Sequence, residues 1–405
     1  MRTFTFKGLF LTAVFMLLGC LSIQAADDDL ITRQITIKLD KAGTLPDKIG
    51  SSKKNLITKL KIVGEVNGTD WCFIREMAGS GYDGKSTEGK LSVLDLSEAK
   101  IVEGGYYYNK YYYYENDVYY YKNCYTSNDV IGKCAFKGCS GLTSLTLPAG
   151  ITEIGDEAFE YCSGLTSLTL PDGITEIGSS AFFGCSGLTS LTLPAGITEI
   201  SSYAFSSCSG LTSLTLPAGI TSIGDDAFYG CSGLTSLNLP AGITTIGSSA
   251  FYGCSGLTSL TIPDGVTKIG KYAFSNCSYL TSLTIPSSVN SLGDYAFKNC
   301  SSLQSVHVSW STPISAGKAF NKADVSKCTL YVPQGTEQDY FLADVWGDFG
   351  NIVEYDPTGI DKVTTSTDAK ELSRYSVNGQ RLATPTKGLN IVKYSDGSVK
   401  KVVVQ

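Results

Sequence analysis

Ten tyrosines gather in one short segment, Gly104 to Cys124, and they are the side chains best suited to contacting a ligand. Tyrosine supplies rigid, amphipathic contact area at low entropic cost, and its mixture with Asn and Gly is typical of binding loops. Aromatic faces also stack on sugar rings. The alternative is that these rings pair as a hairpin or cover the first coil of the fold, with half of them buried. The candidate binding residues are Tyr106, Tyr107, Tyr108, Tyr111, Tyr112, Tyr113, Tyr114, Tyr119, Tyr120 and Tyr121.

Few residues have the types and spacing that catalysis needs. His307 is the only histidine among 405 residues, so a mechanism with a histidine base has one candidate, and we interpret His307 and Trp310 as capping residues instead. The neighbouring acids Asp225 and Asp226 lie in a periodic surface pattern, without an evident pocket to raise the pKa of one of them. Calcium needs about six to eight converging oxygens, which the flanking serines do not offer. We predict no catalytic residue, no metal and no cofactor.

Thirteen cysteines would normally indicate a disulfide framework in an exported protein, but eight of them recur every 23 residues. They are Cys139, Cys162, Cys185, Cys208, Cys231, Cys254, Cys277 and Cys300. Equivalent positions in stacked coils lie about 4.8 Å apart with parallel Cβ vectors, whereas a disulfide needs Cβ atoms nearer about 3.8 Å. We therefore predict buried free thiols here. Cys72, Cys124, Cys134 and Cys328 lie outside this series, and a bridge between Cys124 and Cys134 stays open.

The regular cysteines belong to a repeating unit, Leu-x-x-Leu-x-Leu-Pro-x-Gly-Ile-Thr-x-Ile-Gly-x-x-Ala-Phe-x-x-Cys-Ser-Gly, which runs from Leu165 to Gly187. A fixed period of this length is typical of a solenoid, in which each coil buries its apolar side chains only against its neighbours. The alternation in Leu168–Leu170 predicts a short strand, ended by Pro171. Ile174–Ile177 predicts a second extended run, and Ser179–Cys185 predicts a helical turn. The phenylalanine of each unit, from Phe136 to Phe297, should form a stacked internal spine.

The Pro-x-x-Ile-x-x-Ile-Gly-x-x-Ala-Phe-x-x-Cys pattern resembles the BspA-like leucine-rich repeat family of exported and cell-surface proteins from anaerobic bacteria of the mouth and gut. The near-perfect copies over residues 131–308 carry this resemblance. It implies a leucine-rich-repeat solenoid with a parallel β-sheet, short second strands and helical or 3-10 turns in each coil, capped at both ends. It also implies adhesion to host matrix proteins, other microbes or glycans.

The flanking segments predict further parts. Residues 1–26 read as a signal peptide, while Leu17-Leu-Gly-Cys20 resembles a lipobox that would make Cys20 a lipid-attachment site; both alternatives remain open. The segments 56–62, 64–70 and 91–101 look like degenerate coils within an N-terminal capping region, 27–130. We expect a C-terminal capping coil over 309–357. A linker and small β-module over 358–405 resemble the sorting domains of type IX secretion substrates.

The net charge of the chain and the lengths of its apolar runs exclude some classes of partner. A net charge of −6 and a pI near 5.0 argue against nucleic acid, and no later apolar run approaches the roughly twenty residues of a transmembrane helix. The outward Ser and Thr of each strand could form a hydrogen-bonding platform or simply a polar exterior. We predict a non-catalytic surface protein that binds an extracellular protein or glycan. The alternative is a spacer that has no ligand.

Overall fold

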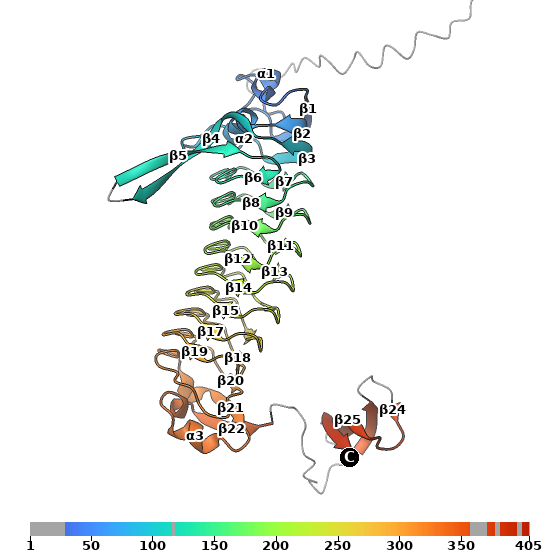
Figure 1. The fold of residues 1–405 in the computed structure, drawn as a ribbon, viewed down its shortest axis with the longest axis vertical. Coiled ribbons are helices and arrows are strands. Elements are labelled where there is room, and N and C mark those ends of the chain that lie inside the picture. Colours follow the sequence, from blue (N-terminus) through green and yellow to red (C-terminus); the bar gives the residue numbers. More distant parts are fainter. Residues whose placement is uncertain (1–28, 116–117, 357–370, 377–380, 395–398, 405) are drawn as a thin grey trace, which may run out of the picture.

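The computed structural model describes residues 29–115, 118–356, 371–376, 381–394 and 399–404, and shows a long stack of coils with a hairpin projecting from its N-terminal end (Figure 1). The predicted fold class, a parallel-sheet leucine-rich-repeat solenoid, is confirmed. The predicted signal peptide and Cys20 lie outside the described residues. No helix within the described ranges is both long and apolar enough to cross a membrane.

The N-terminal end is built from three parallel strands and two helices. They are β1 (Ile35–Leu39), α1 (Leu45–Ile49), β2 (Lys59–Val66), α2 (Gly68–Met77) and β3 (Val93–Ile101). Residues 64–70, expected in a degenerate coil, are divided between the end of β2 and the start of α2. The buried Asp70 joins the two helices, because its carboxylate accepts hydrogen bonds from Asn67 N at 3.0 Å and Leu45 N at 2.8 Å.

All but one of the regular coils contribute a first strand to one face of the stack. These strands are β7 (Ser144–Thr146), β9 (Ser167–Thr169), β11 (Ser190–Thr192), β13 (Ser213–Thr215), β16 (Ser259–Thr261), β18 (Ser282–Ile285) and β20 (Ser305–Val308). They pair in parallel with the 23-residue register of the sequence, as in Leu191 opposite Leu214. Residues 236–238, where Asn238 replaces the usual threonine, have no strand, so this sheet is divided in two.

A second series of two-residue strands forms the next face. These are β6 (Val130–Ile131), β8 (Glu153–Ile154), β10 (Glu176–Ile177), β12 (Glu199–Ile200), β14 (Ser222–Ile223), β15 (Thr245–Ile246), β17 (Lys268–Ile269) and β19 (Ser291–Leu292). Gly178 follows β10, and a Cβ at this position would lie 2.5 Å from Asp156 N of the preceding coil. A side chain at Gly178 would therefore require the two coils to shift locally, whereas the next coil has Ser201 at the equivalent position.

The third side of each coil is a run of turns that also bonds to the next coil. Ala181 N donates to Gly178 O at 3.3 Å, and Cys185 N donates to Phe182 O at 3.1 Å, the i to i−3 pattern of a 3-10 turn. Phe182 N instead reaches Ala204 O of the next coil at 2.8 Å. The left-handed backbone at Ser180 (φ 56°) and Gly184 (φ 70°) prevents these turns from merging into a helix.

The predicted phenylalanine spine is present at the centre of the stack. Successive rings from Phe136 to Phe297 lie 5.1–5.6 Å apart and within 9° of parallel. Tryptophan rings cover both ends of the spine. The ring centre of Trp71 in α2 lies 5.2 Å from that of Phe136, and the ring centre of Trp346 lies 5.7 Å from that of Phe320. The apolar spine is therefore covered at each end by a side chain that is not part of the repeat.

The cysteines of the series are free thiols, as predicted. The seven from Cys162 to Cys300 are also donors, which the sequence did not indicate: Cys185 Sγ donates to Phe159 O at 3.1 Å, and Cys208 Sγ to Phe182 O at 3.1 Å. Burial raises the pKa of Cys231 and Cys300 to about 12. These thiols are inert structural groups.

The C-terminal end departs from the repeat. It comprises the 3-10 helix η1 (Val325–Lys327), β21 (Thr329–Pro333), α3 (Glu337–Leu342), the 3-10 helix η2 (Trp346–Asp348) and β22 (Asn351–Tyr355). A separate antiparallel sheet follows, ordered β24-β23-β25-β26. Its strands are β23 (Glu371–Ser376), β24 (Arg381–Leu382), β25 (Gly388–Tyr394) and β26 (Val399–Val404).

Candidate functional site

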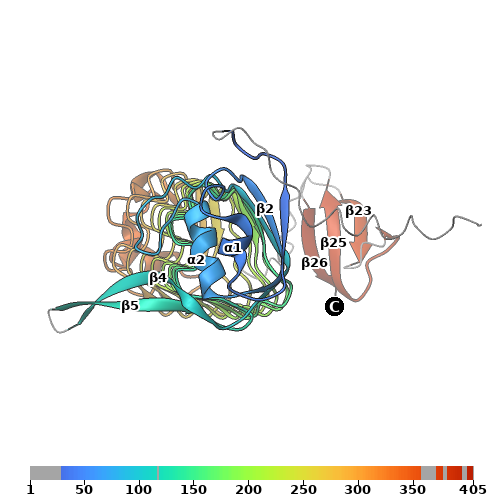
Figure 2. The same cartoon turned by 90° about the horizontal axis from the view of Figure 1, so that it is seen from above.

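The tyrosine-rich segment is a two-stranded hairpin, β4 (Gly104–Glu115) and β5 (Val118–Thr126), which extends sideways from the stack (Figures 1 and 2). Its backbone register places Tyr112 opposite Tyr121, Tyr113 opposite Tyr120 and Tyr114 opposite Tyr119. The side chains of Tyr112, Tyr113, Tyr114 and Tyr119 lie outside the described part of the structure. The other six candidate tyrosines can be placed individually.

Tyr108 anchors the hairpin to the core instead of facing solvent. Its ring lies 6.4 Å from Trp71, and its hydroxyl donates to Lys133 O at 2.8 Å. Burial raises the pKa of this phenol far above its usual range. The neighbouring Asn109 is also buried and donates to Cys134 O at 3.1 Å. Tyr111 lies between these anchors and the hairpin tip, with Lys133 Nζ 4.0 Å from its ring centre.

Beneath the hairpin, Arg75 of α2 completes the hydrogen bonds of the first coil. Within the stack, amides of one coil donate to carbonyls of the next, as in Phe136 N to Ala158 O at 2.6 Å, so the first coil has carbonyls that no preceding coil can satisfy. The buried Arg75 guanidinium donates to Cys134 O at 2.8 Å and Ala135 O at 3.0 Å. Trp71 Nε1 also donates to Ala135 O, at 3.0 Å. Arg75 therefore caps the first coil of the array at the point where the hairpin joins it.

A cluster of rings surrounds Lys110 on the hairpin. Its ammonium lies 5.2 Å from the ring centre of Tyr82, 5.5 Å from Tyr107 and 5.5 Å from Tyr121. Tyr107 also meets Tyr82 and Tyr125 edge to face, at 5.7 and 6.4 Å. Cation–π contacts of this kind fix rings at a surface, which lowers the entropy lost when a ligand binds. Sequence reasoning missed Tyr82 and Lys110 because Tyr82 lies outside the tyrosine run and Lys110 is surrounded by tyrosines in the chain.

At the base of the hairpin is a surface cleft of about 290 Å³. Its walls come from four separate segments: Pro46 of α1, the side chains of α2, Tyr82 of the following loop, and Tyr106 and Tyr107 of β4. The α2 residues in the lining are Thr69, Cys72, Phe73 and Glu76. Glu76 pairs with Lys54 at 2.7 Å, which places one ion pair beside an otherwise apolar wall.

Several rings at or near this cleft are open to solvent. Tyr106 lines the cleft and is 73% exposed. Tyr121, 63% exposed, and the exposed Tyr125 belong to the ring cluster around Lys110 and Tyr107. Tyr120, the neighbour of Tyr121 in β5, is exposed too. Large exposed aromatic side chains gathered around a cleft are typical of a binding surface. The structure therefore divides the predicted tyrosines into Tyr108, which anchors the hairpin, and an exposed group near the cleft that includes Tyr106 and Tyr121.

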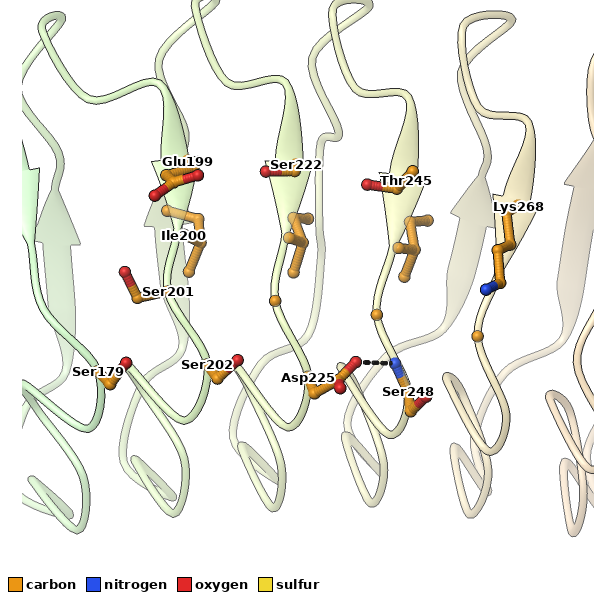
Figure 3. A pocket seen from close by; sticks show the side chains of 15 residues that line it. Ser179, Glu199, Ile200, Ser201, Ser202, Ser222, Asp225, Thr245, Ser248 and Lys268 are labelled. Carbon is orange, nitrogen blue, oxygen red and sulfur yellow. Dashed lines mark hydrogen bonds between the residues drawn. The ribbon is translucent and has the colours of Figure 1, made fainter.

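The array itself carries a groove of about 490 Å³ along the second strands (Figure 3). Glu199, Ser222, Thr245 and Lys268 line it from successive coils, side by side in the figure. Asp225 closes one contact across its edge, accepting a hydrogen bond from Ser248 N at 2.6 Å. Within the described residues, no group of three or more His, Cys, Asp or Glu side chains could hold a metal ion.

We prefer the hairpin cleft over this larger groove as the candidate site. The groove positions are repeat positions, whose side chains follow from the stacking of coils, and six of the fifteen carry only a small hydroxyl. The cleft instead combines residues that have no counterpart in the repeat.

Comparison with known proteins identifies the family of the repeat. The sequence model described as "BspA type Leucine rich repeat region", in six copies, matches residues 109–234 and 221–336, together more than half of the chain. Among functionally curated proteins, none matches the chain.

Several solved structures of leucine-rich repeat proteins match part of this chain. A leucine rich cell surface protein from Faecalibacterium prausnitzii A2-165 is 28% identical, with 56% of this chain and 76% of that chain covered and a TM-score of 0.36. A leucine rich repeat protein of T. pallidum is 29% identical, with 48% and 87% covered and a TM-score of 0.39. One from Bacteroides ovatus ATCC 8483 is 22% identical, with 56% and 82% covered and a TM-score of 0.32.

Proposed function

Because the chain belongs to the BspA-type leucine-rich repeat family, we propose that it is an exported, non-catalytic protein that is displayed at the cell surface and binds an extracellular protein or glycan. Attachment through the C-terminal end would place the repeat stack between the binding site and the cell surface. The single observation that carries this proposal is the cleft at the hairpin base, walled by Tyr82, Tyr106 and Tyr107.

The chemistry of the cleft fits a ring-shaped group. Its wall is mostly apolar, the exposed Tyr106 ring stands at its edge, and the Glu76–Lys54 ion pair supplies hydrogen-bonding groups beside it. A pyranose ring or an aromatic side chain offers both an apolar face and polar edges. We therefore place recognition at Tyr106 and Tyr107, with Tyr120 and Tyr121 extending the surface along the hairpin.

The attachment to the cell has two candidates. Acylation of Cys20 would anchor the N-terminus, whereas the antiparallel module of β23 to β26 would serve as a C-terminal sorting domain. Intact mass analysis of the protein from its native cells distinguishes them: a lipid mass on Cys20 supports the first, and cleavage before residue 371 supports the second.

The binding proposal is tested by screening the full chain against a glycan array and a panel of extracellular matrix proteins. Tyr106→Ala with Tyr107→Ala should abolish the signals that the unchanged chain gives. The matched control is Tyr203→Ala with Tyr279→Ala, because these two array tyrosines are 45% and 65% exposed but lie far from the hairpin in the sequence. Equal loss in both variants would contradict recognition at the cleft.

The alternative function is a spacer without a ligand. The regularity of the array supports it, since repeated hydroxyl side chains offer little to distinguish one partner from another. A full chain that binds nothing in the screen, while its circular dichroism spectrum shows a folded protein, would favour the spacer.

A further inference from the structure

Two groups among the described cysteines differ in their surroundings. Those of the regular series from Cys162 to Cys300 donate to the carbonyl oxygen of a phenylalanine 26 residues earlier, at 3.1–3.4 Å. Their sulfur atoms are thereby held within separate coils. Cys124 and Cys134 are different, because neither takes part in this ladder and each belongs to one side of the junction between hairpin and array.

Cys134 occupies a repeat position that normally faces outward. It has the left-handed backbone (φ 58°) found at the equivalent residues Glu157, Ser180 and Tyr203 of the next coils. Tyr203 is 45% exposed at this position, but Cys134 is 0% exposed. The hairpin covers it: Asn109 of β4, which lies opposite Cys124 of β5, donates to Cys134 O at 3.1 Å.

The two cysteines lie close together under this cover. Cys124 shares the lining of one surface cleft with Gly132 and Lys133, the two residues that precede Cys134, and Cys134 Sγ donates to Glu157 Oε2 at 3.6 Å. The contact with the Cys134 thiol lowers the pKa of Cys124, while hydrogen bonding to Cys124 and burial raise the pKa of Cys134. Cys124 is therefore the better nucleophile of the pair.

We propose that Cys124 and Cys134 form a disulfide that fastens the tyrosine-rich hairpin to the first coil of the array once the protein meets an oxidising medium. The bond closes a short loop and ties β5 directly to the turn that Arg75 and Asn109 already hold. Thirteen cysteines thus provide one cross-link at the base of the hairpin, while the ladder thiols stay reduced. This inference does not depend on whether the hairpin binds a ligand.

The reaction is a thiol–disulfide exchange with a small or protein disulfide as the oxidant. The Cys124 thiolate attacks one sulfur of that disulfide, forming a mixed disulfide and releasing one thiolate. Cys134 then loses its proton to solvent and attacks the Cys124 sulfur, releasing the second thiolate. Two thiols are oxidised and one disulfide is reduced to two thiols. Access is provided by a second surface cleft, of about 370 Å³, which Cys124 lines together with Tyr108, Tyr111 and Lys133.

The test uses the full chain, first fully reduced and then incubated with oxidised glutathione. Free thiols are alkylated in denaturant, and the protein is digested with trypsin without reduction. Cleavage after Lys122, Lys133 and Lys137 puts the two cysteines in different peptides, 123–133 and 134–137. We expect these peptides to be found joined, and eleven alkylated cysteines, two fewer than the thirteen of the chain.

Both peptides recovered in alkylated form, or a bridge from either cysteine to a different residue, would overturn the proposal. Cys124→Ser and Cys134→Ser should each remove the joined peptide, whereas the control Cys254→Ser, a ladder position, should keep it. Limited trypsin digestion of the native protein supplies an independent readout. Cleavage at Lys122 should be slower in the oxidised chain than in the reduced chain, and this difference should vanish in Cys124→Ser.

Discussion

The side chains of the regular array and those of the N-terminal hairpin are subject to different physical constraints. In the array, each coil must present the same surface to the coil before and after it, so Phe182 and Cys185 recur at fixed spacing and are buried. The hairpin contacts the stack at its base, through Tyr108, Asn109 and Tyr111. Among its described side chains nearer the tip, Tyr120 and Tyr121 are exposed and are not constrained by stacking. Variation in the array is therefore limited by folding, whereas variation in the hairpin is available for recognition.

The largest effect should come from interrupting the phenylalanine spine. Phe205→Ala removes a fully buried ring that stacks on Phe182 and Phe228, each at 5.3 Å. Such a truncation lowers the free energy of unfolding by about 3–5 kcal/mol, because the neighbouring coils are held by the same contacts and cannot close the cavity. Urea unfolding followed by circular dichroism measures the loss.

The hairpin gives the matched control for this prediction. Tyr121→Ala removes a ring of similar size that is largely exposed, and should change the free energy of unfolding by no more than about 0.5 kcal/mol. A comparable loss in both variants would mean that the hairpin is part of the folding core, contrary to the division drawn above.

Arg75→Met should give the next largest effect, at the junction of the two regions. The substitution keeps much of the side-chain volume but removes the guanidinium hydrogen bonds to the carbonyls of Cys134 and Ala135, which keep Asn109 Nδ2 and Trp71 Nε1 as donors. A hydrogen bond to a charged group contributes about 1.5–3 kcal/mol. We expect a loss of about 2–4 kcal/mol, together with faster hydrogen exchange at the first coil than at a central coil. Uniform exchange along the array would contradict a capping role.

The period of the sequence was sufficient to predict most of the array. A 23-residue repeat with apolar residues at fixed positions allows one stacking solution, so the strands, the parallel register and the phenylalanine spine follow from pattern alone. The donor role of Cys185 does not follow, because burial of a thiol and its hydrogen bond to Phe159 O leave the same sequence signal. The left-handed backbone conformation of Ser180 could not be predicted either, because serine does not require that conformation.

The candidate site could be predicted only in composition. The tyrosine run indicated aromatic contact area, but the sequence could not separate Tyr108, which is buried, from Tyr106, which is exposed. That separation depends on how β4 crosses α2, a contact between segments without a repeat relationship. For the same reason Tyr82 and Phe73, which wall the cleft, had no signal in the local pattern.

A small effect is expected on the outer face of the array. Thr212 is exposed, and its hydroxyl donates to Thr189 O of the preceding coil at 3.1 Å. Thr212→Val should lower the free energy of unfolding by about 0.5 kcal/mol, because water can take over part of a hydrogen bond at the surface. A loss above about 2 kcal/mol in urea unfolding would contradict this expectation. It would mean that an exposed hydroxyl stabilises the stack almost as much as the buried ring of Phe205.

The smallest effect should appear at the C-terminal end, where aromatic side chains replace the outward threonines. His307 of β20 takes the place of Thr284 in the register and stacks on Tyr331 at 4.2 Å. Burial lowers the pKa of His307, so the folded protein holds the proton less tightly than the unfolded chain does. Stability from this site is then complete above the ordinary pKa of about 6.5 and falls as the pH drops through that value toward the lower folded pKa.

The single histidine makes this prediction directly measurable. Its imidazole Cε1 proton should give one NMR signal that titrates with a midpoint below about 6.5. His307→Gln should remove the corresponding fall in stability between about pH 7 and pH 5, while Thr284→Ala should leave it in place. A midpoint at or above about 6.5 would mean that the imidazole is hydrated like a side chain of the array exterior, and that the aromatic stack at this end does not shield it.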